Sequence, residues 1–326
     1  MSKAKQWFET AKHFVAAKPA REVSPLGLPL DALIDLRFDA EKLNLDSRKR
    51  VLTDYAGMHI SGFKGRGIDF EEVRGYQPGD DIRLMDWRVT ARTGKPHTKV
   101  FHEERERPVF IVVDHSASMY FGTRVTFKSA IATEAAALIA WAGMHHHDRI
   151  GGIVFQGQKH IELRPRGGKF GVLPLLKYLS ESQIPQQVTP EPDALTEALA
   201  RLRRVARPGS LVFILSDFAN LNEHSENHLK LLTRHNDVVS CFIYDMLEKT
   251  PPPPDRYLVT DGQQQLVMDT AHNKFCRTYA AQFDAHWQHL KTLHQQHNAL
   301  LIDIATSDNV LERLQQGLGG TQCERT

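Results

Sequence analysis

Residues 108–119 read PVFIVVDHSASM, and this stretch decides the fold. The run 109–113 is entirely apolar and mostly β-branched, which is typical of a strand buried on both faces of a sheet. Asp114 ends the run, and Ser116 and Ser118 follow at alternate positions. One carboxylate and two hydroxyls on a short turn are hard oxygen ligands, which suit Mg²⁺. The pattern also fits a strand-ending aspartate followed by serines that cap the next helix.

The composition of the 326-residue chain is that of a soluble globular protein, with 41% hydrophobic and 25% charged residues. The net charge of +2 gives no reason to expect nucleic-acid binding. No apolar run approaches the ~20 residues that span a bilayer, and no apolar signal segment follows the first lysines. The scattered cysteines indicate a reducing compartment. We therefore expect a cytoplasmic protein, with an amphipathic pattern in residues 1–27 that favours a docking or frayed helix over peripheral membrane contact.

Strand and helix patterns alternate along most of the chain. Apolar runs at 149–155, 160–163, 211–215, 238–244 and 300–304 predict strands, and helical spacing at 127–144, 170–179, 194–205 and 270–297 predicts helices. This alternation predicts a mostly parallel sheet with helices on both faces. Ligands of such sheets collect beyond the carboxyl ends of the strands. Asp217, like Asp114, directly follows an apolar run, so the two acids together favour the metal interpretation of the 108–119 loop.

The stretch ahead of residue 108 has a different character, and we divide the chain into residues 1–57, 58–107 and 108–320. The first is helical in pattern, with Leu33 and Leu36 as expected core contacts. The second interleaves acids, arginines and aromatics around a Pro-Gly turn, which predicts a small, charge-paired, β-rich module. Its motif residues are Arg74, Tyr76, Asp80, Arg83, Asp86 and Trp87. They form either a structural brace or a partner-binding surface.

The DHSAS loop and the later SDF at 216–218 resemble a von Willebrand factor A-type domain with a metal-ion-dependent adhesion site. That resemblance implies a Rossmann-like, doubly wound sheet. It also implies metal ligands at Asp114, Ser116, Ser118 and Asp217, with Mg²⁺, or alternatively Mn²⁺ or Ca²⁺, as the cofactor. A threonine normally completes the family's site. In the loop VTPEPDALTEAL (188–199), Thr189 is the nearest candidate and Thr196 a weaker one.

A second resemblance covers roughly residues 60–305. The string FEEVRGYQPGDDIRLMDW at 70–87, followed by Ala91 and Arg92, is similar to the bacterial family called domain of unknown function 58. The resemblance implies a partner, a MoxR-type AAA+ ATPase, and a role as an adaptor or assembly and chaperone factor. We therefore expect a Mg²⁺-dependent protein-interaction module that is not an enzyme.

Two alternatives stay open. A scaffold with a degenerate metal site would keep the fold without the metal. A metal-dependent hydrolase or phosphatase is less favoured, because Ser-x-Ser stands where an aspartyl nucleophile and a second acid would be expected. His115 is expected to point away from the alternating ligands, which leaves the loop without a general base.

Overall fold

The computed structural model describes residues 27–45, 68–77, 82–103, 106–157, 159–182, 191–260 and 265–319. These fall into two compact units. The larger contains residues 27–44 and 108–319, and the smaller contains the described residues between 45 and 107. The predicted boundary at 57/58 lies outside the described residues, as does any helix in residues 1–26.

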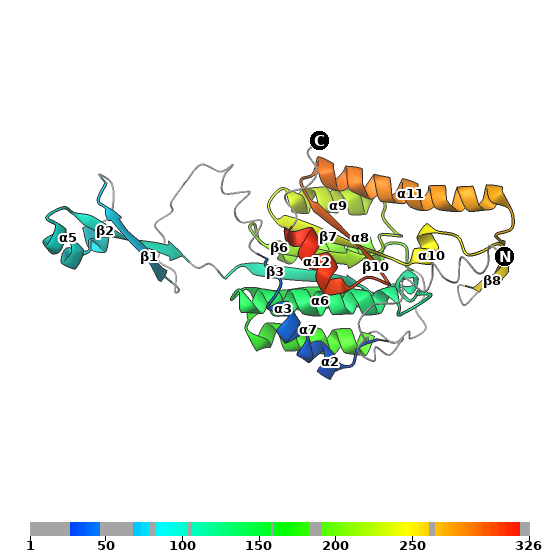
Figure 1. Cartoon of the computed structure of the whole chain (residues 1–326), viewed down its shortest axis with the longest axis horizontal. Helices are drawn as coiled ribbons and strands as arrows, with labels where there is room; N and C mark the ends of the chain where they lie inside the picture. Colours follow the sequence, from blue (N-terminus) through cyan, green and yellow to red (C-terminus); the bar gives the residue numbers. More distant parts are fainter. Residues whose placement is uncertain are drawn as a thin grey trace, which may run out of the picture. The chain divides into compact units, whose positions relative to one another are not determined.

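The larger unit is built on a six-stranded sheet with the order β10-β7-β6-β3-β4-β5 (Figure 1). Its strands are β3 Pro108–Asp114, β4 Arg149–Gln156, β5 Lys159–Gly167, β6 Leu211–Ser216, β7 Asp237–Tyr244 and β10 Leu300–Ala305. All neighbours pair in parallel except β4 and β5. The chain starts in the middle at β3, runs outward through β4 to β5, and then crosses to β6 on the other side of β3. This arrangement confirms the predicted doubly wound, mostly parallel α/β fold, with its switch point between β3 and β6.

Helices cover both faces of this sheet (Figure 1). They are α2 Leu30–Asp35, α3 Arg37–Ala40, α6 Lys128–His145, α7 Lys169–Ser182, α8 Ala194–Val205, α9 Glu223–Thr233, α10 Met246–Lys249, α11 Asn273–Gln296 and α12 Val310–Gly319. Helices α6 and α7 pack on one face, and α8, α9 and α11 on the other. The indole N–H of Trp141 in α6 donates to the carbonyl oxygen of Leu33 at 2.9 Å, which holds α2 against α6. None of the helices within the described ranges is both long and apolar enough to cross a membrane.

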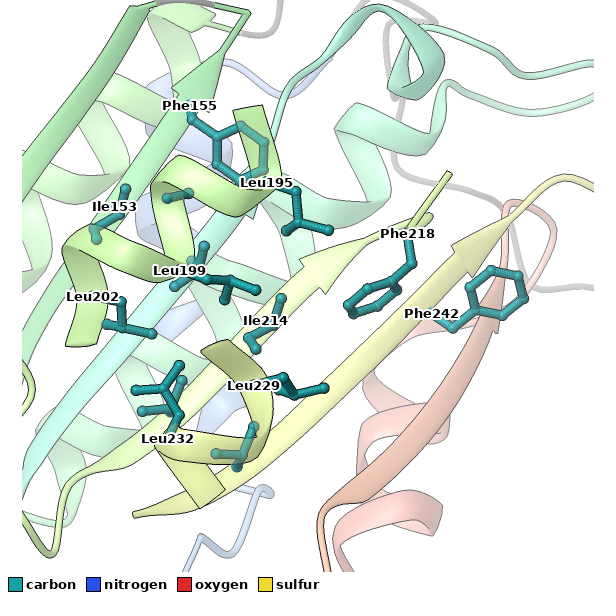
Figure 2. Close-up of a cluster of buried hydrophobic side chains, with 14 of the residues drawn as sticks. Ile153, Phe155, Leu195, Leu199, Leu202, Ile214, Phe218, Leu229, Leu232 and Phe242 are labelled. Atoms are coloured by element: carbon teal, nitrogen blue, oxygen red, sulfur yellow. The ribbon is translucent and has the colours of Figure 1, made fainter. Parts of the chain in front are cut away.

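The face under α8, α9 and α11 forms a continuous apolar core (Figure 2). Because side chains alternate along a strand, the even-numbered residues of β3, β6 and β7 point to this face. The labelled members are Ile153, Phe155, Leu195, Leu199, Leu202, Ile214, Phe218, Leu229, Leu232 and Phe242. This packing fixes the ends of β6 and β7, after which the polar residues of the candidate site begin.

A hairpin, β8 Arg256–Thr260 and β9 Gln265–Asp269, pairs antiparallel between α10 and α11. An Asp-Gly pair between two apolar runs is a signal for such a hairpin, and here that pair, Asp261 and Gly262, lies outside the described part of the chain. Its facing residues Leu258 and Val267 are both exposed.

The smaller unit contains β1 Ile68–Gly75 and β2 His97–Glu103, which pair antiparallel, and α5 Trp87–Thr93. The sequence-based description of this unit as β-rich overlooked α5. The helix begins because the carboxylate of Asp86 accepts hydrogen bonds from the backbone N–H groups of Arg88 and Val89, at 3.0 and 3.1 Å. It ends at Gly94, whose φ of 70° is the left-handed conformation of a helix C-cap.

We expect Gly171→Ala to destabilise the larger unit by about 3 kcal/mol, the upper end of overpacking costs. A β-carbon there would lie 2.7 Å from the carbonyl oxygen of Ile150 and still closer to that of Arg166, and neither backbone oxygen can move aside. Gly167→Ala is the matched control, because a β-carbon at Gly167 meets nothing within 4 Å. Urea unfolding of the two variants measures the difference, and equal unfolding free energies would contradict the close approach of α7 to β4.

Candidate functional site

The candidate site lies at the carboxyl ends of β3 and β6. These strands are parallel neighbours, with Val113 facing Leu215, so their ends meet at the switch point. Asp114 closes β3, and Asp217 follows the last residue of β6. Both carboxylates are buried, with exposures of 4% and 6%. Two acids that lie 103 positions apart in the sequence are thereby brought to one edge of the sheet.

The two serines of the loop connect these acids. One carboxylate oxygen of Asp114 accepts a hydrogen bond from the backbone N–H of Ser116 at 2.8 Å. The hydroxyl oxygens of Ser116 and Ser118 lie 3.2 Å apart, and hydrogen bonding to Ser118 is among the effects that lower the pKa of Asp217. The structure therefore brings together the four predicted ligands. A further hydroxyl, that of Ser216, donates to the second oxygen of Asp114 at 2.5 Å.

The charges of the two acids are balanced unequally. Burial, and after it the neighbouring charge of Asp217, raises the pKa of Asp114 to about 6, against the opposing effect of the Ser216 and Ser116 hydrogen bonds. Burial is the largest effect on the pKa of Asp217 and would raise it, but the charge and hydrogen bond of Lys128, together with the hydrogen bonds of Ala219 and Ser118, lower it. Among the residues that the structure describes, Asp114 is thus a buried carboxylate without a cationic partner of its own, next to one that has such a partner.

The cationic partner, Lys128, is the main residue that sequence reasoning missed. Its ammonium donates to Asp217 at 2.8 Å and to Glu248 at 2.7 Å, and its side chain is 1% exposed. A signal was present in the sequence. Lys128 is the first residue of an alanine-rich helix that is buried along most of its length, and a cation at a helix N-terminus is disfavoured by the helix dipole. A lysine in that position needs an acid from elsewhere in the fold.

A third acid at a strand end, Asp245 after β7, has a structural role. Its carboxylate accepts hydrogen bonds from the hydroxyls of Thr123 and Thr306, both at 2.6 Å, and from the backbone N–H of Leu247 at 2.8 Å. Although burial would raise its pKa, these hydrogen bonds lower it. Glu248 reaches back to the N–H of Asp245 at 2.8 Å, so α10 starts with a capping box that also positions the Glu248 partner of the lysine.

His115 points away from the four oxygen ligands, as predicted. One ring nitrogen lies 2.8 Å from the hydroxyl of Ser182 in α7, and the other 3.2 Å from that of Thr133 in α6. Burial lowers its pKa to about 4, so the ring is neutral at physiological pH. Both nitrogens are occupied by packing contacts between helices.

The threonine of the site falls outside what the structure describes. Thr189 lies in the undescribed segment 183–190. The hydroxyl of Thr196, the weaker candidate, donates to Asn222 at 3.1 Å, and Asn222 caps α9. Thr196 therefore joins two helices.

The donor set of the site fits a hard divalent cation. It consists of two carboxylates, only one of which forms an ion pair among the described residues, and two hydroxyls that lie 3.2 Å apart. Within the described ranges, no three His, Cys, Asp or Glu side chains are placed to hold a metal ion together. A metal at this site would therefore depend on Ser116, Ser118 and water in addition to the two aspartates.

The motif residues of the smaller unit divide into two kinds. Asp86 caps α5, and the N–H of Tyr76 donates to the carbonyl oxygen of Pro96 at 2.9 Å, next to the half-buried Arg74. Arg83 and Trp87 are exposed, Trp87 by 66%. Asp80 lies outside the described residues. Part of the motif therefore builds the unit, and part of it lies on the unit's surface.

The sequence matches the family described as "Protein of unknown function DUF58" over residues 72–289. It is 30% identical over 213 residues to the uncharacterized proteins Rv1480 of Mycobacterium tuberculosis and Mb1516 of Mycobacterium bovis, in a match covering 65% of this chain and 66% of each relative. That match is just under two thirds of the relatives' length. A shorter match, 36% identical over 59 residues, covers 18% of this chain and 15% of the uncharacterized protein YeaD of Bacillus subtilis.

Two solved structures are similar at low identity. The conserved hypothetical protein BatB of Bacteroides thetaiotaomicron has a TM-score of 0.41 and 17% identity, covering 65% of this chain and 97% of BatB. The manganese-loaded TRAP protein of Plasmodium vivax has a TM-score of 0.30 and 17% identity, covering 42% of this chain and 57% of TRAP. The fold assignment rests on the strand order and strand directions given above.

We expect Lys128→Met to lower the free energy of unfolding by about 3–5 kcal/mol, because it leaves the buried Asp217 and the half-buried Glu248 without their counter-charge. Lys177→Met is the matched control: Lys177 is 65% exposed, and its distant pairing with Glu181 contributes little. The double variant Lys128→Met/Asp217→Asn should lose less than the sum of the single variants. Urea unfolding in chelator compares these variants and the single variant Asp217→Asn with the wild type, and equal effects of the two lysine substitutions would contradict the buried bridge.

Proposed function

The chain belongs to the DUF58 family of proteins of unknown function, and from this premise we propose that its larger unit is a divalent-metal-dependent protein-interaction module. The observation that carries the proposal is the convergence of Asp114 and Asp217 at the switch point, with Ser116 and Ser118 joined to them. Open α/β sheets bind their ligands at this position.

The metal we propose is Mg²⁺, with Mn²⁺ or Ca²⁺ as substitutes. Asp114, Ser116, Ser118 and Asp217 would hold it, with Thr189 as the candidate for a fifth protein ligand. All of these are oxygen ligands, and Mg²⁺ keeps several waters when few carboxylates bind it. When bound, the metal supplies a positively charged docking point for a carboxylate of a partner protein.

The partner we propose is a MoxR-type AAA+ ATPase, for which the chain would act as an adaptor or assembly factor in the cytoplasm. This choice follows from the resemblance carried by the motif at residues 70–87. The exposed side chain of Trp87 in that motif offers an apolar surface to a partner protein, although the metal-dependent contact is assigned to the larger unit.

We propose binding rather than catalysis at this site. A hydrolase would need a general base within reach of the metal edge. The imidazole of His115 is neutral, buried and turned toward Ser182 and Thr133. The imidazole of His286 also borders the edge, with its Nε2 3.2 Å from the backbone carbonyl oxygen of Asp217. The ammonium of Lys128 already forms ion pairs with two carboxylates, those of Asp217 and Glu248. The groups that border the four oxygens are therefore suited to positioning a cation.

A scaffold without a metal is the second candidate, and one observation favours it. The ammonium of Lys128 already neutralises Asp217, so part of the charge that a metal would meet is balanced within the fold. In that case Lys128 is the resident cation of the site, and partner binding does not depend on Mg²⁺.

Calorimetric titration of Mg²⁺ into the full chain separates these candidates. We expect saturable binding that Asp114→Asn weakens by at least about tenfold, because ligand charge sets the affinity of such sites. Asp284→Asn on the exposed surface of α11 is the control and should leave the affinity unchanged. A wild-type chain without saturable binding would favour the scaffold.

Pulldown of a MoxR-type ATPase tests the partner. We expect capture by the wild-type chain and by Asp284→Asn in Mg²⁺, and loss of capture by Asp114→Asn in the same buffer. Because all three chains meet the ATPase in the same Mg²⁺ buffer, a difference in capture comes from the metal site of the chain and not from the ATPase's own need for magnesium. Undiminished capture by Asp114→Asn, or by the wild type in excess chelator, would overturn the metal-dependent contact.

A further inference from the structure

A cavity of about 480 Å³ opens beside the candidate metal edge, on the side of α11. Its lining residues come from the ends of β6 and β7 and from α10 and α11. They are Asp217, Ala219, Phe242, Glu248, Tyr279, Gln282, Phe283 and His286. The cavity is in the size range of pockets that hold small ligands. It shares Asp217 with the metal edge but adds a different set of side chains.

Aromatic rings form one wall of this cavity. The ring centroid of Phe242 lies 5.9 Å from that of Phe283 and 5.6 Å from that of His286, and Figure 2 shows Phe242 at the far end of the apolar cluster. Tyr279 is fixed by a hydrogen bond from its hydroxyl to the carbonyl oxygen of Leu247 at 2.9 Å. Phe242 is buried and stacks against Tyr244 and Trp287, so the half-buried rings of Tyr279 and Phe283 are the ones that border the open space.

The same aromatic cluster already attracts cations elsewhere on its surface. The ammonium of Lys249 lies 5.9 Å from the ring centroid of Tyr244, and that of Lys291 lies 4.9 Å from the ring of Trp287. Both rings are within 5.5 Å of Phe242. Ring faces of this cluster are thus suited to cation–π contacts.

The charge of the cavity is negative. Among the residues that the structure describes, its lining contains the carboxylates of Asp217 and Glu248 and no lysine or arginine. Lys128, which is 1% exposed, pairs with both carboxylates and balances a single negative charge. Burial chiefly raises the pKa of Tyr279, and the charges of Glu248 and Asp245 add to this effect while that of Lys128 opposes it.

We propose that this cavity binds an arginine side chain of a protein partner, with the guanidinium between the aromatic wall and the carboxylates of Asp217 and Glu248. Arginine fits better than lysine, because its planar group stacks on rings and can donate to two acceptors at once. This proposal depends on the proposed function in one respect only: it assumes that the bound arginine side chain belongs to a partner protein. It adds that the partner carries a basic residue near the acidic residue that reaches the metal edge.

The test uses N-acetyl-arginine amide as the probe and N-acetyl-citrulline amide as its uncharged analogue, with the full chain in chelator at low salt. NMR titration measures both affinities. We expect the arginine probe to bind at least about tenfold more tightly than citrulline, since the analogue keeps the shape and loses the charge. Equal binding of the two probes, or no binding of the arginine probe, would overturn the proposal.

Substitutions at the exposed rim residue Gln282 locate the binding without disturbing the fold. Gln282→Lys should weaken the arginine probe several-fold, and Gln282→Glu should strengthen it. Gln295→Lys, on an exposed position near the other end of α11, is the matched control and should change nothing. If Gln295→Lys and Gln282→Lys weaken binding equally, the probe senses only the overall charge and the cavity assignment is wrong. Because the assay contains chelator, a failed Mg²⁺ titration leaves its outcome unaffected.

Discussion

The buried ammonium of Lys128 is the interaction on which the edge of the larger unit depends. It joins the end of β6, through Asp217, to the start of α10, through Glu248, and it stands at the first turn of α6. Removing an ammonium from water is costly, and two carboxylates at hydrogen-bonding distance offset that cost. Because Glu248 also caps Asp245, the same bridge sets the position of the β7 end. One cation thus holds together three chain segments that lie far apart in the sequence.

The unequal treatment of the two aspartates follows from this bridge. Asp217 has its cation within the fold, whereas Asp114 has only hydroxyl and N–H donors. A carboxylate in that situation can be stabilised by a proton or by an external cation. The fold therefore places a stabilised acid beside an unstabilised one. This asymmetry is what makes the edge a candidate for ligand binding, in contrast to the fully satisfied acid Asp245 nearby.

Most of the sheet could be predicted because its strands are short apolar runs ended by polar residues. The strands of the folded chain lie where these runs predict them. The four loop and strand-end ligands were also predictable, since parallel strands end at a common edge. Lys128 was not, because its partners lie 89 and 120 positions away and only the folded chain brings them together. Helix α5 was overlooked because WRVTART has no apolar stripe, and its start depends on the cap at Asp86.

The antiparallel edge strand β5 has a consequence for the behaviour of the protein in concentrated solution. An open sheet edge is a template on which another chain can add a strand and begin to aggregate. Here that edge carries the exposed charged side chains of Glu162, Arg164 and Arg166, and Pro165 lacks the N–H that a ladder requires. An incoming strand would have to bury these charges and would find a missing donor. The residues that close the sheet on this side thus also protect it against edge-to-edge association.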